Sequence, residues 1–271
     1  MQSERDSSGQ SVTTTYSVKR VVGQPGGRTA PSFILNHLDI ELTERCNNAC
    51  VHCYINLPES DERAKRRELT TEQWKHIIRQ AADLGVLTIR FTGGEPLLRE
   101  DFSELYEYTR RLGIKVTLFT NARLITPQLA DLFLRIPPLK KLEITVYGMS
   151  PSSYDAVSAS PGAFTEYQRG IRLLLENNIP FVVKSVLLPH NKHEKQLFDA
   201  WAATIPGMTN DPPSVILLDH RARHDLSRKN ALIDQLRLTP EEIIQILTAN
   251  EEEYARSMAQ FSSTFMYPQG D

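Results

Sequence analysis

All three cysteines of this chain, Cys46, Cys50 and Cys53, lie within one short stretch. Such close spacing of soft thiol ligands is typical of a metal or iron–sulfur site and not of a disulfide framework. Structural zinc needs four ligands, and His52 could be a fourth, but its place directly beside Cys53 is an awkward spacing for a tetrahedral site. A [4Fe–4S] cluster held by three cysteines would leave one iron open to a small chelating ligand. The spacing favours the cluster and leaves zinc as the alternative.

The composition excludes several function classes. The 271 residues are 40% hydrophobic and 24% charged, and the formal net charge of −2 argues against nucleic acid binding through bulk charge. The chain contains no apolar run near the roughly 18 residues that cross a bilayer, and its N-terminus has no hydrophobic signal core. We therefore expect a cytoplasmic protein that binds neither nucleic acid nor a membrane.

Strands alternate with helices along most of the chain. Residues 1–32 are expected to be a flexible tail with one short strand at 16–22. The predicted strands are 38–43, 87–91, 114–119, 141–146, 181–188 and 214–218. Helices are predicted from Thr70 to Gly85, from Asp101 to Gly113, from Thr126 onward, at about 163–177 and 193–203, and from Thr239 to about 258. These repeats indicate a parallel α/β sheet, either an open partial barrel or a doubly wound sheet, because six units are too few for a closed eight-stranded barrel.

Most predicted strands alternate apolar and polar residues, whereas strands covered on both faces are usually continuous apolar runs. If the apolar set faces the helices, a polar set lines the interior, and its members are Glu41, Arg90, Thr117, Glu143, Thr145 and Lys184. Either internal ion pairs or a polar ligand would satisfy these groups. Ligands of open parallel sheets bind outside the carboxyl ends of the strands, where the cysteines also fall, so a ligand is favoured.

The run from Cys46 to Tyr54, CNNACVHCY, resembles the signature of the radical S-adenosylmethionine superfamily. The similarity continues in Gly93-Gly94-Glu95-Pro96 after the second strand and in Thr120-Asn121 after the third, and it covers about residues 36–220. The resemblance implies a partial (β/α)6 barrel of parallel strands over residues 33–225. Residues 226–271 would then be a C-terminal helix and tail, or the start of a longer extension in a truncated chain.

The resemblance also implies the cofactors. Cys46, Cys50 and Cys53 would hold a [4Fe–4S] cluster whose open iron binds S-adenosylmethionine, and reductive cleavage would yield a 5′-deoxyadenosyl radical that abstracts hydrogen from a substrate. The residues expected to hold S-adenosylmethionine are Gly93, Gly94, Glu95, Pro96, His52, Tyr54, Asn121, Thr145 and Lys184. The two glycines would let the backbone approach a ligand, and Glu95 would accept a hydrogen bond from the methionine ammonium. Arg90 and Tyr147 are expected to touch the substrate.

Within the superfamily, residues 140–220 look most similar to SPASM/twitch-type members, which modify peptides or peptide-derived cofactors. This chain has no cysteine after Cys53 for their auxiliary clusters. We expect a peptide or small-molecule substrate, an external electron donor such as flavodoxin or ferredoxin, and a partner protein over the open side of the barrel. The alternative is a non-catalytic, truncated module that binds a cluster or zinc and serves as a partner subunit.

Overall fold

The computed structural model describes residues 35–53, 55, 57–208, 214–215, 218 and 228–265. The tail 1–32, the short strand predicted at 16–22 and Tyr54 lie outside the described residues. No helix in these described ranges is long and apolar enough to cross a bilayer.

Six parallel strands form the main sheet, in the order β1-β4-β5-β6-β7-β8. Their bounds are His37–Thr43, Thr88–Gly93, Lys115–Thr120, Leu142–Val146, Phe181–Val186 and Ser214–Val215. Two further strands, β2 (Arg45–Cys46) and β3 (Leu57–Pro58), pair only with each other. All six predicted strands are present, although the last is seen only as Ser214–Val215, because residues 216–217 of the predicted 214–218 lie outside the described residues. Because sheet order follows chain order, the sheet winds in one direction, and the partial barrel is confirmed over the doubly wound alternative.

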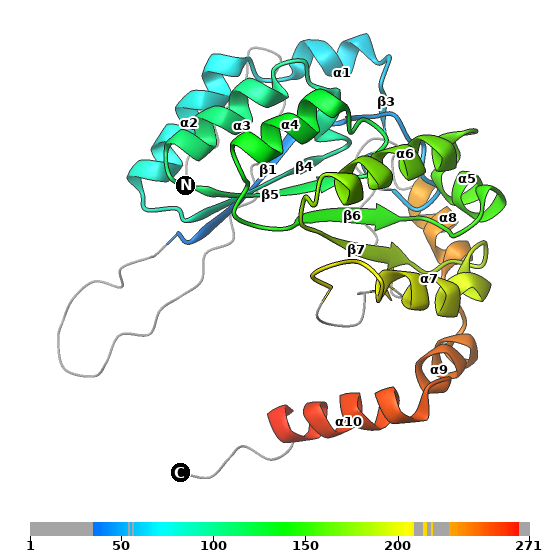
Figure 1. Ribbon diagram of the computed structural model, residues 1–271. Coiled ribbons are helices and arrows are strands. Elements are labelled where there is room, and N and C mark those ends of the chain that lie inside the picture. Colours follow the sequence, from blue (N-terminus) through cyan, green and yellow to red (C-terminus); the bar gives the residue numbers. More distant parts are fainter. Residues whose placement is uncertain are drawn as a thin grey trace, which may run out of the picture.

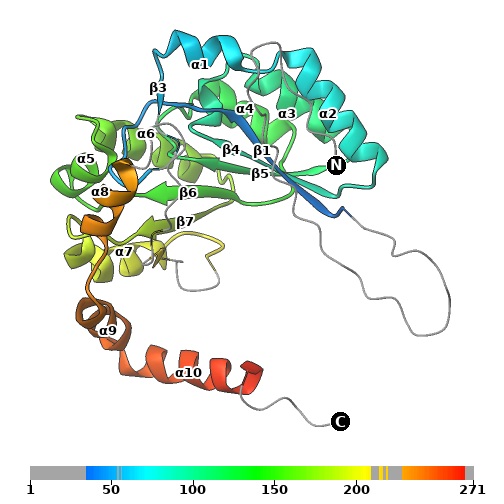
Figure 2. The same ribbon diagram turned by 180° about the vertical axis from the view of Figure 1, so that it is seen from behind.

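The helices lie mostly on the outer face of the sheet, where α2, α3 and α4 run beside β1, β4 and β5 (Figure 1). Their bounds are α1 Glu62–Arg67, α2 Thr71–Asp83, α3 Phe102–Arg111, α4 Pro127–Arg135, α5 Pro151–Ser158, α6 Ala163–Glu176, α7 Lys195–Ala202, α8 Arg228–Leu236, α9 Pro240–Thr248 and α10 Glu251–Phe265. Short 3₁₀ turns, η1 (Pro96–Leu98) and η2 (Lys192–Glu194), follow β4 and precede α7. Helices α9 and α10 extend away from the barrel, as the view from behind also shows (Figure 2).

Local start signals explain most of these helices. The predicted capping box is present at α2, where the Thr70 hydroxyl accepts from the Gln73 N–H and the Gln73 side chain accepts from the Thr70 N–H. The single helix expected from Thr239 to about 258 is wrong, because the chain bends at 249–250 and begins a new helix. The carbonyl of Asn250 accepts the first hydrogen bond of α10, and asparagine favours helix ends over helix interiors. Helices α1, α5 and α8 were not predicted.

Burial follows the alternation seen in the sequence. Leu38, Ile40 and Leu42 of β1 are at most 3% exposed and pack under the helices, whereas the polar residues between them are half-buried. A smaller apolar cluster lies at the carboxyl end of the strands and consists of Val157, Val186, Leu188, Leu218, Ile233 and Leu236. It joins α8 to the end of β7, so it includes residues on both sides of the domain boundary predicted at residue 225.

Candidate functional site

The segment that carries Cys46, Cys50 and Cys53, here called the cysteine loop, follows the carboxyl end of β1. Cys46 ends β2, Cys50 is 5% exposed, and Cys46 and Cys53 are half-buried; none of the three is in a disulfide. The Cys53 N–H donates to the Cys50 carbonyl at 3.0 Å, which closes a turn and brings these two residues together. The rim at the carboxyl ends of the strands therefore carries all three thiols, as predicted.

Helix α5 holds this loop from outside. The N–H groups of Ala49 and Val51 donate to the carbonyls of Ser158 and Val157, at 2.9 and 3.1 Å. These carbonyls belong to the last turn of α5, which has no helical partners for them. The sequence did contain a start signal for α5, because Pro151 stands in the first turn behind a serine cap.

Arg123 clamps the first half of the loop, and sequence reasoning missed it. The guanidinium donates to the Asn47 carbonyl, to Asn48 Oδ1 at 2.5 Å and to the Glu166 carboxylate at 2.8 Å. Arg123 is 8% exposed, so these charge-assisted bonds are screened little by solvent. We therefore assign Arg123 to positioning the loop.

The predicted cofactor residue Asn121 lies directly beside the loop. Its side-chain amide is 2.7 Å from Asn47 Oδ1 and 4.0 Å from Cys46 Sγ. The Asn48 N–H also points at the Cys46 sulfur, at 3.4 Å. Donors aimed at a sulfur stabilise its thiolate form, which is the form that binds metal.

The Gly93–Pro96 segment, here called the GGEP turn, is bound to the start of the cysteine loop. The Gly94 N–H donates to the Thr43 carbonyl at 2.8 Å, and the Glu95 N–H donates to the Arg45 carbonyl at 2.9 Å. A Cβ on Gly93 would lie 2.3 Å from the Thr43 oxygen, and one on Gly94 would lie 2.1 Å from the Arg45 oxygen. The glycines are thus required by the approach of the chain's own backbone, whereas the sequence analysis attributed them to a ligand.

The Glu95 carboxylate is 1% exposed and organises the rim from inside. It accepts from the Thr120 hydroxyl at 2.9 Å, from the Asn121 N–H at 2.9 Å and from the Leu97 N–H at 3.2 Å. Burial raises the pKa of Glu95 to about 7, and these hydrogen bonds oppose the shift. A carboxylate has about four acceptor positions, so at most one is left for an ammonium, and the predicted contact with methionine stays a prediction.

Burial also raises the pKa of the thiols. The pKa of Cys50 rises to about 12, with the Cys53 charge adding to burial and the Tyr147 hydroxyl opposing it. The pKa of Cys46 is raised by burial and then by the Glu95 charge. Three thiolates and a carboxylate gathered in one buried place need positive charge nearby, which bound metal supplies.

An ion network supports the base of the loop, and it too was missed. The Glu68 carboxylate binds Arg45 at 2.7 Å and Arg99 at 3.4 Å, and it accepts from the Thr43 hydroxyl at 2.5 Å. Arg99 also donates to the Leu42 carbonyl at 3.3 Å. The network ties the last residues of β1 to the segments after α1 and η1, so the loop starts from a fixed point.

Other predicted residues lie deeper in the barrel. Lys184 is 3.4 Å from the Glu143 carboxylate, and its ammonium lies 3.1 Å from the centre of the Phe119 ring. The Arg90 guanidinium lies 4.4 Å from the same ring and binds Asp39 at 2.9 Å. Ion pairs therefore occupy part of the polar interior, and the cofactor role of Lys184 stays a prediction without a supporting contact.

The aromatic side of the rim contains His52 and Tyr147, whose ring centres are 5.9 Å apart. Tyr147 also packs edge-on against the buried Tyr154 at 5.4 Å, so it stands beside the cysteine loop. Thr145 is half-buried and in register with Lys184. The adenine, ribose and substrate roles predicted for these residues stay predictions.

The chain supplies three soft thiol ligands from one loop. A [4Fe–4S] cluster attaches each cysteine to a different iron, so three thiols would satisfy three irons and leave one open. Structural zinc would need a fourth protein ligand. The donor set is therefore that of a cluster with one open iron.

A half-closed parallel barrel with a three-cysteine loop at its carboxyl rim defines an α/β protein built around an iron–sulfur site. The family described as the radical SAM superfamily matches residues 40–200, and the chain belongs to this superfamily. Membership implies a [4Fe–4S] cluster and S-adenosylmethionine as its cofactors, as the sequence analysis expected.

Two curated relatives illustrate the sequence similarity. The chain is 34% identical over 154 residues to the AdoMet-dependent heme synthase of Methanosarcina barkeri, covering 57% of this chain and 43% of the relative. It is 30% identical over 169 residues to the PqqA peptide cyclase of Xanthomonas axonopodis pv. citri, covering 62% and 42%. The chain thus spans less than half the length of these relatives.

Solved structures show the same fold. The anSMEcpe structure with bound AdoMet superposes with a TM-score of 0.58 at 14% identity, covering 83% of this chain and 59% of that one. Streptococcus suis SuiB bound to S-adenosylmethionine gives 0.51 at 18% identity, covering 81% and 49%. At these identities the similarity is evidence for the fold alone.

Proposed function

We propose that this chain is a radical S-adenosylmethionine enzyme that acts on a peptide or a peptide-derived cofactor precursor. One observation carries the proposal: the cysteine loop, the GGEP turn and Asn121 meet at one rim and are joined by direct hydrogen bonds. Asn121 alone connects Glu95 at 2.9 Å with Asn47 at 2.7 Å. A chain that only stored a metal would not need this second, glycine-dependent turn beside its thiols.

Cys46, Cys50 and Cys53 would hold the cluster, and the GGEP turn would face the amino acid part of S-adenosylmethionine. When bound, these cofactors supply an electron that breaks the sulfonium C–S bond and a 5′-deoxyadenosyl radical that abstracts hydrogen from the substrate. The chain's own residues fix the geometry for this chemistry. The buried Glu95 and Arg123 hold the turn and the loop in place, and donors from Asn48 and Asn121 point at the Cys46 sulfur.

The substrate class is supported by the relatives. One of them, 30% identical over 169 residues, is named a peptide cyclase. An external donor such as flavodoxin or ferredoxin would supply the electron, and a partner protein would cover the open side.

The test is anaerobic reconstitution with iron and sulfide, reduction with dithionite and addition of S-adenosylmethionine, followed by quantification of 5′-deoxyadenosine. The native chain should form 5′-deoxyadenosine, and Cys50→Ala should form none because one iron loses its ligand. Val51→Ala changes the neighbouring residue without removing a ligand and should retain activity. A colourless chain that binds zinc and yields no 5′-deoxyadenosine would overturn the proposal in favour of a non-catalytic module.

A further inference from the structure

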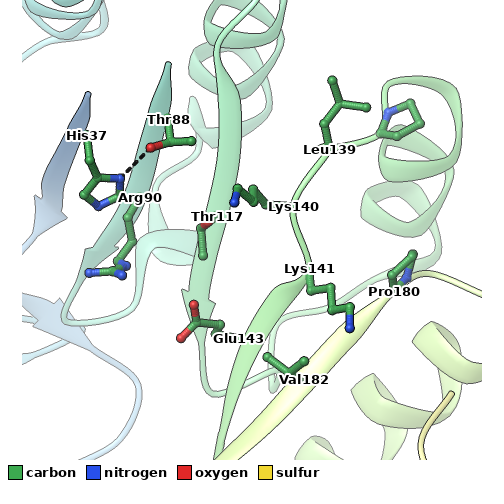
Figure 3. A pocket seen from close by; sticks show the side chains of 11 residues that line it. His37, Thr88, Arg90, Thr117, Leu139, Lys140, Lys141, Glu143, Pro180 and Val182 are labelled. Atoms are coloured by element: carbon green, nitrogen blue, oxygen red, sulfur yellow. Dashed lines mark hydrogen bonds between the residues drawn. The ribbon is translucent and has the colours of Figure 1, made fainter. Parts of the chain in front are cut away.

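A cavity of about 760 Å³ opens at the amino end of the strands (Figure 3). His37 and Thr88, the first residues of β1 and β4, lie on one side of it, and Pro180, just before β7, lies on the other. The cysteines follow the opposite ends of the strands. At about 3.3 Å per residue, Thr88 is roughly 17 Å along β4 from Gly93. The cavity is therefore separate from the rim described above.

The lining of this cavity is positive, although the whole chain carries a net charge of −2. Its ionised side chains are three cations, Arg90, Lys140 and Lys141, against one carboxylate, Glu143. Lys141 donates to the Gly207 carbonyl, which leaves its charge uncompensated. Lys140 is exposed and forms no ion pair with any residue that the structure describes. The charge imbalance favours an anionic occupant.

Arg90 forms the inner wall of the cavity. Its guanidinium is held between Asp39, at 2.9 Å, and the Phe119 ring, at 4.4 Å from the ring centre. Its Nε is buried and donates to no acceptor among the described residues. The side chain as a whole is 31% exposed and lines the cavity. Arg90 therefore adds a positive charge to the cavity lining, next to the Asp39 carboxylate.

The mouth of the cavity combines apolar side chains with backbone strain. Leu139 lies at the mouth, is 58% exposed and has a φ of 61°, a left-handed conformation that L residues rarely adopt. Such strain is often retained at binding sites. Pro180 and Val182 line the opposite side. An aliphatic chain that carries an anionic group would find apolar contact at the mouth and cations within.

We propose that this cavity binds a carboxylate of the substrate, between Arg90 on its inner wall and Lys140 at its mouth. The proposal rests on the proposed function, and it adds a substrate class, a peptide with an acidic side chain. Arg90 precedes Gly93 by three residues, so the carboxylate would be anchored about 10 Å below the reacting rim. Only an extended substrate reaches both places.

The test measures binding of two blocked pentapeptides to the full chain by isothermal titration calorimetry. One is acetyl-Ala-Ala-Glu-Ala-Ala-amide, and the other has Gln at the centre. The acidic peptide should bind on the order of tenfold more tightly, because it alone forms charge-assisted hydrogen bonds. Arg90→Gln should remove the preference, Lys140→Gln should reduce it, and Arg79→Gln, an exposed arginine of α2 paired with Asp83, should leave it unchanged.

The outcomes separate the two proposals. A native chain that forms 5′-deoxyadenosine but binds both peptides equally overturns the carboxylate site alone. If the native chain forms no 5′-deoxyadenosine but prefers the acidic peptide, and Arg90→Gln removes that preference, the proposed enzyme activity is overturned and the carboxylate site is supported. If Arg90→Gln fails to fold by circular dichroism, the exposed Lys140→Gln decides, and a preference that it leaves intact overturns the carboxylate site.

Discussion

Replacing Gly94 with alanine is expected to separate the GGEP turn from the cysteine loop. The new Cβ would lie 2.1 Å from the Arg45 carbonyl oxygen and 2.6 Å from its carbon. Both atoms belong to the backbone and cannot rotate away, so the two segments must move apart by more than about 1 Å to regain normal contact. That shift breaks the 2.8 Å bond from the Gly94 N–H to Thr43 and the 2.9 Å bond from the Glu95 N–H to Arg45. We expect a loss of about 3 kcal/mol, since each broken bond leaves buried groups unsatisfied.

Gly113 provides the matched control. It follows α3 with a φ of +80°, and a Cβ added there would meet no atom within 4 Å. Gly113→Ala therefore introduces only the left-handed backbone strain, about 1 kcal/mol. Gly94→Ala should exceed it by about 2 kcal/mol, although the chemical change is the same.

Urea unfolding followed by tryptophan fluorescence measures the free energy of unfolding of both variants. Iron per chain after reconstitution measures whether the loop still presents its thiols. Gly94→Ala should unfold at lower urea than Gly113→Ala and hold less iron. If the two variants unfold together and hold equal iron, the hydrogen bonds between turn and loop do not position the cysteines, and the account of the rim is refuted.

Two further substitutions test the clamp and the barrel interior. Arg123→Gln removes charge-assisted bonds to Asn47 and Asn48 and should destabilise the loop by about 2 kcal/mol. The amount of iron that the chain retains through gel filtration should therefore fall. Unchanged iron retention would show that Arg123 is not needed to position the loop. Burial disfavours the charged ammonium and lowers the pKa of Lys184 from 10.5 to about 8. The free energy of unfolding that depends on Lys184 is therefore greatest above about pH 10.5, and this stability is lost as the pH falls through about 8. As the pH rises between these values, the free energy of unfolding in urea should increase by up to about 3 kcal/mol more in the native chain than in Lys184→Met. If the two proteins show the same dependence on pH, the lowered pKa is contradicted.

The strands and the rim could be predicted because both follow from local patterns. Leu38, Ile40 and Leu42 alternate with polar residues, and that period fixed the strand and the face that packs under the helices. The carboxyl ends of parallel strands meet at one edge, so Cys46 and Asn121 could be placed together without a structure.

The supports of the site could not be predicted, because they depend on contacts between distant segments. Nothing in the neighbouring sequence separates Arg123 from a surface arginine, yet it binds the backbone of Asn47, 76 residues away. The sequence identified the two glycines of the GGEP turn but not the segment of backbone that they contact. Only the fold shows that it is the backbone of Thr43 and Arg45.

On the proposed function, the distribution of charge along the barrel axis favours some substrates over others. In the middle, Asp39 binds Arg90 and Glu143 binds Lys184, so acidic and basic side chains are equal in number there, and Arg90 also lines the amino-end cavity. The carboxyl rim gathers three thiols and the buried Glu95 carboxylate, and it is complemented by cationic cofactors. The amino end has surplus lysines and is complemented by an anion. A neutral substrate would gain nothing from those lysines, and a cationic one would be repelled by them. A peptide with one acidic side chain at the amino-end cavity would fit this distribution, because its carboxylate would lie away from the thiols and the Glu95 carboxylate of the rim.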